Sequence, residues 1–319
     1  MANSAKATAM TVAASDSLAQ NRPVQGLAMR LLAILALATM MALVKLAADR
    51  GVHIIESVFY RQAFALLFLI PIILSRGGFV TVKTQRMVVH GQRLIVGLSG
   101  MIFNFWAVSL LPLAEATSIS FTVPIFATLL AILLLSESVG WHRWGAMLAG
   151  FAGVLIIVQP GGGSIAWQGA VVALTGALLT ALVSIIIRTL GRTEKPVTVV
   201  FWFTLLSLPP LGLAMLWFGA WHDALTWAII AGIGFCGGIG QLALTSSLRM
   251  APVSIVLSAD YTSLIWATIF GWLIWQNWPS PWTWIGAPLI IGSGLYIAWR
   301  EHRVAQAEIR KTSGNRAAA

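Results

Sequence analysis

Two charged side chains lie deep inside long apolar stretches of the sequence. Arg61 lies about eight residues, or ~12 Å of helix, from the start of the run 53–75, and Asp260 lies about as far from the start of the run 252–275. A charge at the centre of a bilayer is costly, so such a group usually faces a cavity or a partner. We expect the two to share a central cavity, where Asp260 binds a cationic group or a proton and Arg61 binds a carboxylate. The alternative is a buried ion pair between them.

Uncharged polar side chains lie at similar depths. Tyr261 follows Asp260 directly, and Ser120, Asn104 and Gln241 lie at comparable levels of their own apolar runs. This polar density is typical of a hydrogen-bonding cavity, although in lipid such groups also bond helix to helix, for about 1 kcal/mol each. Trp106 also lies well inside its run, where it either lines a cavity or packs against lipid and helices.

Three further charges lie within a turn or two of the ends of apolar runs. Lys45, Glu56 and Glu115 are all expected near the same, external face, where they would ring an outer mouth. Their long side chains also allow each of them to reach water individually from a helix end, which needs no function.

The composition shows what must position these residues. Of 319 residues, 58% are hydrophobic and 9% are charged, with a mean hydropathy of +0.86, whereas soluble proteins are about 25% charged. The solvent must therefore be lipid. Runs of about twenty apolar residues, the length that crosses a ~30 Å hydrocarbon core, occur ten times. They predict an all-α membrane protein with ten transmembrane helices at 26–48, 53–75, 91–111, 113–135, 143–159, 167–188, 196–218, 225–248, 252–275 and 282–299.

The second half of the chain repeats the first at an offset near 140. Gly97 and Gly100 align with Gly237 and Gly240, and Ser120 aligns with Asp260. Each repeat holds five spans, and because five is odd, the second copy enters the membrane from the opposite side. Inverted repeats of this kind give many secondary transporters their two alternating conformations. We expect a disordered cytoplasmic tail at 1–25, a first repeat at 26–159, an external linker at 160–166, a second repeat at 167–299 and a basic cytoplasmic tail at 300–319.

The charge distribution predicts the orientation. With both termini inside, seventeen Lys and Arg residues fall in cytoplasmic segments, Arg30 and Arg93 among them, while Arg50 alone is outside and Lys45 and Arg61 fall within spans. Positive loops stay on the cytoplasmic face, so the termini are expected there. The net charge of +10 is thus a topology signal and argues against a nucleic-acid partner.

Small residues crowd the run 225–248. Gly234 and Gly238 form a small-xxx-small pair, for which close helix packing is a sufficient explanation. A hinge for alternating access is the sharper hypothesis.

The fourth and fifth spans resemble a known family. Pro124, the stretch Ala127-Thr128-Leu129-Leu130 to Leu135-Ser136-Glu137, and Gly145 to Gly153 are similar to the EamA family of the drug/metabolite transporter superfamily, as is Arg61 in Tyr60-Arg61-Gln62-Ala63. The second copy departs from the family pattern at Leu264 and Asn277, and its stretch from Asp260 to Ala267 resembles a bacterial subgroup. The resemblance implies two inverted five-helix repeats in a bacterial inner membrane.

The family likeness also sets the expected function. Its members export amino acids, purines, drugs or other metabolites, and a few take up cofactors such as riboflavin. We therefore expect a carrier that moves a small polar or amphipathic metabolite outward, with uptake of a cofactor or nucleoside-like compound as the alternative. The expected partners are this small molecule and the lipid bilayer. Proton coupling rests on Asp260 alone, and the oligomeric state stays open, a monomer included.

Other function classes lack their residues. Gly97-Leu98-Ser99-Gly100 has the form used by intramembrane serine proteases, but every histidine lies at a span end or in a loop, so the base is missing. The single cysteine, Cys236, excludes disulfides and cysteine-based metal sites. Nucleotide-binding motifs are absent, so we expect no cofactor, no metal and no direct use of ATP. A channel would more often show a filter signature or charged rings.

Overall fold

A computed structural model describes residues 23–75, 77–135, 141–159, 167–191, 193–250 and 259–317. In these ranges the regular secondary structure is helical. The elements are α2 (Pro23–Asp49), α3 (Ile54–Ser75), η1 (Gly78–Val82), α4 (Met87–Leu110), α5 (Leu113–Ser120), α6 (Val123–Leu135), α7 (Trp141–Val158), α8 (Trp167–Gly191), α9 (Pro196–Phe218), α10 (Ala224–Met250), η2 (Asp260–Thr262), α12 (Ser263–Trp275) and α13 (Pro281–Ala317). Most of the predicted tail at 1–25, the predicted linker at 160–166 and Glu137 lie outside the described residues.

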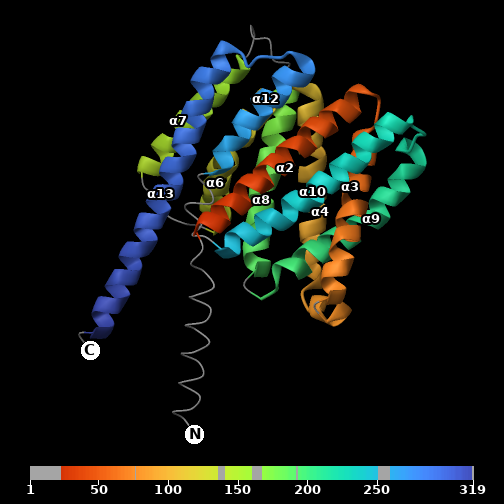
Figure 1. Ribbon diagram of the computed structural model, residues 1–319. Helices are drawn as coiled ribbons and strands as arrows, with labels where there is room; N and C mark the ends of the chain where they lie inside the picture. The colour runs from red at the N-terminus through yellow and green to blue at the C-terminus, as the bar shows by residue number, and fades with distance from the viewer. Residues whose placement is uncertain are drawn as a thin grey trace.

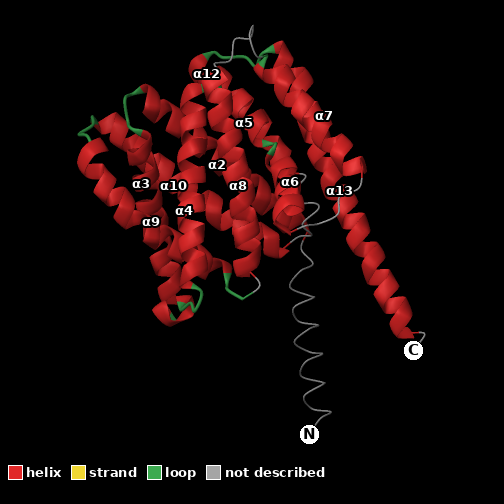
Figure 2. Cartoon of the chain, turned by 180° about the vertical axis from the view of Figure 1, so that it is seen from behind, coloured by secondary structure: helices red, strands yellow, loops and turns green. Residues whose placement is uncertain are grey.

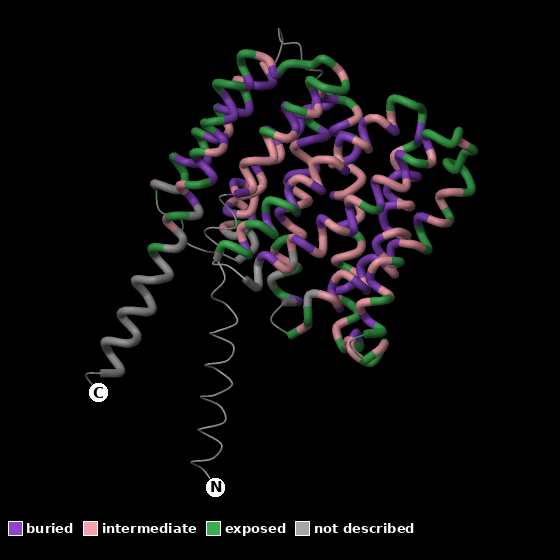
Figure 3. Tube along the Cα trace, viewed as in Figure 1, coloured by how far each residue is buried: buried purple, intermediate pink, exposed green. Residues whose placement is uncertain are grey.

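The helices are long and apolar, as the composition requires. Among the described residues, seven segments are long and apolar enough to cross a membrane, and Trp144–Val158 is a shorter apolar helix. Large apolar and aromatic side chains such as Leu216, Trp217 and Trp284 are exposed on the outside of the bundle, while the inward faces are buried (Figure 3). This pattern is typical of a protein whose surface meets lipid. The number of spans and their orientation stay predictions.

The two halves of the chain interleave. α2 packs along α10 and α8 packs along α4, so the first helix of each half lies beside the third helix of the other. α3 packs against α9 at one edge of the bundle, and α7 packs against α13 at the opposite edge (Figures 1 and 2). Residues far apart in sequence therefore meet throughout the interior.

The fourth predicted span is not one continuous helix. α5 ends at Ser120 and α6 begins at Val123, with the Phe121 and Thr122 amides donating to Ser118 and Ile119 in tighter, i to i−3 bonds of 3.2 and 3.0 Å. Pro124 has no N–H and so cannot bond back to Ser120, which accounts for the interruption. In the second half, the 3₁₀ turn η2 precedes α12 at the equivalent place. The predicted span 113–135 thus consists of α5 and α6, and Leu113–Leu130 within it is long and apolar enough to cross a membrane.

The Gly234 and Gly238 pair is a packing surface for α3. A Cβ added at Gly234 would lie 2.4 Å from the Phe64 ring, and one at Gly238 would lie 2.6 Å from the Phe68 ring. The two aromatic rings thus fill the space that the missing side chains leave. Close packing explains the pair, and the hinge hypothesis stays a prediction.

Gly286→Ala is expected to lower the stability of the α7–α13 contact. A Cβ at Gly286 would lie 2.5 Å from the Gly153 carbonyl oxygen and 2.5 Å from Ile157 Cγ1, so the two helices would have to separate. Such overpacking costs about 1–3 kcal/mol. Gly292→Ala on the same helix is the matched control, since a Cβ there meets nothing within 4 Å. Thermal unfolding in detergent should show a lower midpoint for Gly286→Ala alone; equal midpoints would refute the close contact.

Candidate functional site

Asp260 forms a two-pronged ion pair with Arg30. Arg30 Nε donates to Asp260 Oδ1 at 2.6 Å, and Arg30 Nη2 donates to Oδ2 at 2.5 Å. The Arg30 side chain is 6% exposed and the Asp260 side chain 37% exposed. The charge count places Arg30 on the cytoplasmic side, which stays a prediction; the structure adds that its side chain turns inward from the first part of α2. Its Nη1 is buried without a hydrogen-bond partner.

Arg61 lies elsewhere in the bundle. It is 7% exposed and its Nη1 donates to the Gln62 amide oxygen at 2.5 Å, while Gln62 Nε2 donates to the Ser207 hydroxyl at 2.7 Å. Beside Gly237, Arg61 and Met40 are the nearest side chains, so Arg61 sits near Met40 on α2. Met40 is ten residues from Arg30, which is about 15 Å along the helix. Asp260 therefore pairs with Arg30 and not with Arg61, which rules out the alternative of an Arg61–Asp260 ion pair; the shared cavity stays a prediction.

Arg93 approaches Arg61 from α4. Its guanidinium lies 4.1 Å from the centre of the Phe203 ring, and its Nη1 covers the bare face of Gly97, where a Cβ would clash with it. Phe203 is four residues, one helical turn, before Ser207 on α9, which bonds to Gln62 beside Arg61. The charge count places Arg93 on the cytoplasmic side, which stays a prediction; the structure adds that Arg93 lies in α4 and that its long side chain reaches inward by a further helical turn. The sequence holds one signal for this inward position. Arg93 lies one helical turn before Gly97, whose missing side chain leaves room for it, and Gly97 is the repeat mate of Gly237.

The two helix interruptions meet through Phe121 and Tyr261. Their rings pack edge to face with centroids 5.1 Å apart. Phe121 and Tyr261 are equivalent positions of the two repeats at the offset of 140, so this contact places them where the two repeats face each other. Ser120, the mate of Asp260, donates its hydroxyl to the Ala116 carbonyl within its own helix at 2.9 Å.

The remaining polar positions are dispersed. Asn104 Nδ2 donates to the Gly100 carbonyl at 2.7 Å and to Thr180 Oγ1 at 3.1 Å, which joins α4 to α8. Gln241 is half-buried on α10. Trp106 is 41% exposed on α4, as a lipid-facing side chain would be. The structure does not gather these three residues around Asp260, and their role in binding stays a prediction.

The three residues expected at an outer mouth are buried and bonded to protein groups. Lys45 Nζ donates to the carbonyls of Val108 and Leu111 at 3.1 and 3.0 Å. Glu115 Oε1 accepts from the Ser280 amide at 3.2 Å. Glu56 Oε1 lies 3.0 Å from His222 Nε2. These charged side chains connect the ends of neighbouring helices. They are buried, so they do not extend individually into water.

Two His–Glu contacts tie the halves together. Glu56 in the first turn of α3 bonds to His222, just before α10, at 3.0 Å. His90 in the first turn of α4 bonds to Glu194, just before α9, at 2.7 Å. Each contact joins the start of the second long helix of one half to the start of the third of the other. Sequence reasoning considered the histidines only as missing catalytic bases and did not find these pairs.

A surface pair accompanies Glu56–His222 at the same end of the bundle. Arg50 Nη2 donates to Asp223 Oδ2 at 2.9 Å. The Thr226 hydroxyl, and then Arg50, lower the pKa of the Asp223 carboxyl. Because Asp223 directly precedes α10, its carboxylate also caps that helix, as an acidic residue at a helix start does.

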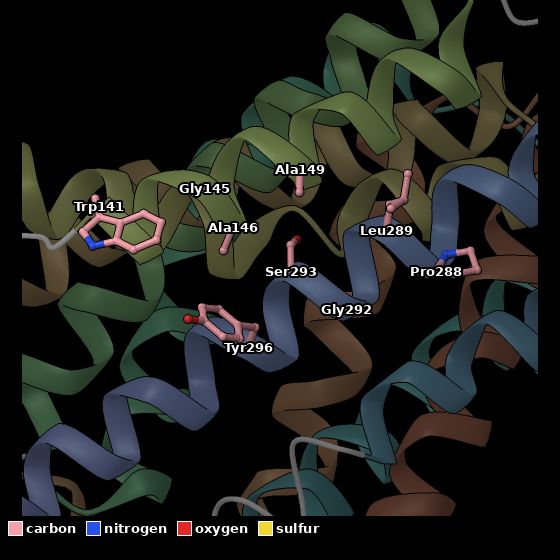
Figure 4. Close-up of a pocket in the computed structure, with 9 residues that line it drawn as sticks. All are labelled: Trp141, Gly145, Ala146, Ala149, Pro288, Leu289, Gly292, Ser293 and Tyr296. Carbon is pink, nitrogen blue, oxygen red and sulfur yellow. The ribbon is translucent and has the colours of Figure 1, made fainter.

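Two hollows lie beside α13. A groove of about 440 Å³ between α7 and α13 is lined mainly by apolar and small residues, with Ser293 and Tyr296 as polar members (Figure 4). A second, of about 370 Å³, lies along α12 and includes Tyr261, Trp272 and Trp284. Of the predicted site residues, Tyr261 alone lines either hollow. Within the described residues, no group of three His, Cys, Asp or Glu side chains could hold a metal ion.

Comparison with known proteins agrees with this architecture. The EamA-like transporter family matches residues 24–159 and again 167–299, which confirms two repeats. A riboflavin transporter of Rhizobium johnstonii is 31% identical over 249 residues, covering 78% of this chain and 82% of the relative. The pseudopaline exporter CntI of Pseudomonas aeruginosa is 28% identical over 276 residues, covering 83% and 93%.

A solved crystal structure shares the fold. It superposes with a TM-score of 0.60 at 20% identity, covering 88% of this chain and 99% of the other. The family and the relatives indicate a transporter of small molecules and not an enzyme. The family model matches both halves of the chain, and the matched regions contain apolar helices long enough to cross a membrane. This chain is therefore a multi-pass membrane protein of the EamA-like transporter family.

Proposed function

We propose that this protein is a secondary carrier that moves a small polar or amphipathic metabolite across the cytoplasmic membrane by alternating access. It crosses the bacterial inner membrane ten times, five in each inverted repeat, with both termini in the cytoplasm. The repeats are 26–159 and 167–299, joined outside by 160–166. The observation that carries the proposal is the contact between the repeat mates Phe121 and Tyr261. Interrupted helices that meet at a repeat interface are where many such carriers bind their cargo.

The paired His–Glu contacts support alternating access. The two contacts lie at opposite ends of the bundle. Glu56–His222 lies where α3 begins, and His90–Glu194 lies where α4 begins, after α3 has crossed the bundle. Each links the two halves at one membrane face. A carrier opens to one face at a time, so one contact would break while the other holds.

Asp260 is the proposed coupling residue. Its carboxylate is part-exposed beside the helix interruption and is held by Arg30 through both oxygens. A proton or a cationic group of the cargo would compete with Arg30 for this carboxylate and so free α2 from η2. Tyr261, next in sequence, would contact the cargo through the hollow that it lines. Ser120, Asn104, Gln241 and Trp106 complete the proposed binding residues, and Lys45, Glu56 and Glu115 the outer mouth.

Export is the proposed direction. Uptake of riboflavin is a second candidate function, which the name of the Rhizobium relative favours. The two are distinguished with purified protein in liposomes of defined orientation, preloaded on one side with labelled amino acids or riboflavin.

Exchange of labelled riboflavin is the expected result for the second candidate, and exchange of amino acids for the first. In either case Asp260→Asn should slow exchange, with Asp223→Asn as the control on a surface acid. A lack of exchange with every compound of a broad amino-acid, purine, vitamin and cationic-drug panel would contradict the carrier proposal.

A further inference from the structure

The side chains of Arg61 and Arg93 both lead to the same turn of α9, because Gln62, which accepts from Arg61, donates to Ser207, and Arg93 lies over the ring of Phe203, four residues earlier. Arg61 lies fourteen residues before the end of α3 at Ser75, or about 21 Å from that end. α4 begins at this same end, and Arg93 lies six residues, or about 9 Å, into it. The Arg93 side chain then extends over Gly97, a further turn inward. The two side chains come from neighbouring helices, α3 and α4, which both pack against α9 (Figure 2).

These two charges lack an acidic partner among the residues that the structure describes. Arg61 donates to the neutral Gln62 amide, and Arg93 lies over the Phe203 ring. The Nε atoms of both side chains are buried without a hydrogen-bond partner. Thr204, next to Phe203, also has a buried hydroxyl without a partner. Most buried polar atoms in proteins are bonded, so several unbonded donors on three packed helices indicate a missing acceptor.

The missing acceptor must carry negative charge. An arginine stays protonated in a protein, so two neighbouring guanidinium groups cannot relieve their repulsion by losing a proton. Each cation inside the membrane region is costly by itself, and their mutual repulsion adds to the cost. An oxyanion removes both costs, since two guanidinium groups can each donate paired hydrogen bonds to carboxylate or phosphate oxygens.

The repeat supplies the room for this arrangement. Gly97 and Gly237 are repeat mates, and each lies directly beside one of the two arginines. A Cβ at Gly237 would lie 3.4 Å from Arg61 Nε, and a Cβ at Gly97 would clash with Arg93 Nη1. The Phe203 ring supports the face of the Arg93 guanidinium, which leaves its edge donors for an anion.

We propose that Arg61 and Arg93 form an oxyanion subsite on the cargo path, which binds a carboxylate or phosphate group of the transported metabolite. This inference rests on the proposed carrier function. It restricts the cargo to compounds with an acidic group at transport pH. Arg30 and Asp260 would then act on a separate part of the same cargo or on the coupling proton. Arg30 lies about 15 Å along α2 from Met40, the residue of that helix near Arg61.

The test uses acetate and inorganic phosphate as probes of the full-length protein in detergent at pH 7. Each sodium salt replaces part of the sodium chloride at constant ionic strength, and thermal unfolding is recorded. A ligand that binds only the folded state raises the midpoint. At a concentration about ten times the dissociation constant, the expected rise for wild type is about 2–4 °C. A rise with acetate assigns the site to carboxylates, and one with phosphate alone assigns it to phosphates.

Arg61→Gln and Arg93→Gln should each abolish the rise. Lys83→Gln is the matched control, since it removes one exposed cation outside the site and should leave the rise intact. Arg93→Lys keeps the charge without the fork of donors and should show a reduced rise, which separates loss of binding from loss of folding. Failure of wild type to respond to either anion, or a response that survives both glutamine variants, overturns the proposal.

The outcome is separable from that of the carrier proposal. Exchange in liposomes without any anion response would refute only the subsite. An anion response that needs both arginines, without exchange of any compound, would refute only the carrier function.

Discussion

Asp260→Asn is expected to slow exchange roughly tenfold to a hundredfold, the effect of losing a charged hydrogen bond of about 1.5–3 kcal/mol. The same variant should unfold at a lower temperature. Asparagine cannot balance the buried Arg30 guanidinium, whose side chain is 6% exposed and already has one unpartnered nitrogen. Thermal unfolding and liposome exchange of one preparation measure the two effects together.

The double variant Arg30→Gln/Asp260→Asn separates stability from transport. Removing both charges leaves no unpaired ion, so much of the lost stability should return. Exchange should stay low, because the coupling carboxylate is absent. Recovery of both properties in the double variant, or in the exchanged pair Arg30→Asp/Asp260→Arg, would make the ion pair structural only. Asp223→Asn is the control, because the Arg50–Asp223 pair is on the surface and such pairs contribute little.

Crosslinking either His–Glu contact is expected to stop exchange. The chain has a single cysteine, so Cys236→Ser gives a background in which new cysteines can be placed in pairs. Replacing His90 and Glu194, or Glu56 and His222, puts two thiols where the side chains now touch. A short bifunctional maleimide then joins the two halves at one end of the bundle, and a joined end cannot open. We expect exchange to fall roughly tenfold or more, since the linked state allows access from the other face only.

The control for this experiment is a monofunctional maleimide on the same cysteine pairs, which modifies the thiols without linking the halves. Exchange should then fall far less than with the crosslinker. Full exchange after crosslinking of both pairs in one molecule would contradict alternating access at these ends.

The sequence was sufficient for the helices and the repeat. Apolar length predicts α2, α3, α4, α7, α8, α9 and α10 within a few residues, because a lipid solvent imposes one requirement on every span. α13 continues past the predicted span 282–299 to Ala317, through most of the predicted basic tail. The alignment of Gly97 with Gly237 was visible because helix packing constrains small residues at equivalent places. The interruption at Phe121–Thr122 was missed, since hydropathy is continuous there while the backbone bonds are not.

The partners of the charges could not be predicted in this way. Counting residues from a span end gives the depth of a Cα atom, but not the face of the helix or the direction of a long side chain. Such counting assigns Arg30 and Arg93 to a side of the membrane, but it does not show that both side chains turn inward. Arg30 and Asp260 are 230 residues apart, and the path between them depends on how the two halves interleave. One sequence holds no signal for that pairing.

The Arg30–Asp260 pair also makes the two alternating conformations of the carrier unequal in free energy. In two inverted repeats, exchanging the conformations of the halves puts each residue in the surroundings of its mate. The mate of Asp260 is Ser120, which has no charge and bonds to its own helix. The ionic contact therefore has no counterpart in the exchanged conformation. Each 1.4 kcal/mol of difference shifts the populations of the two conformations tenfold. Without cargo, the protein would mainly adopt the conformation that contains the Arg30–Asp260 contact. Binding of the cargo or the coupling ion would have to supply the free energy for the change to the other conformation.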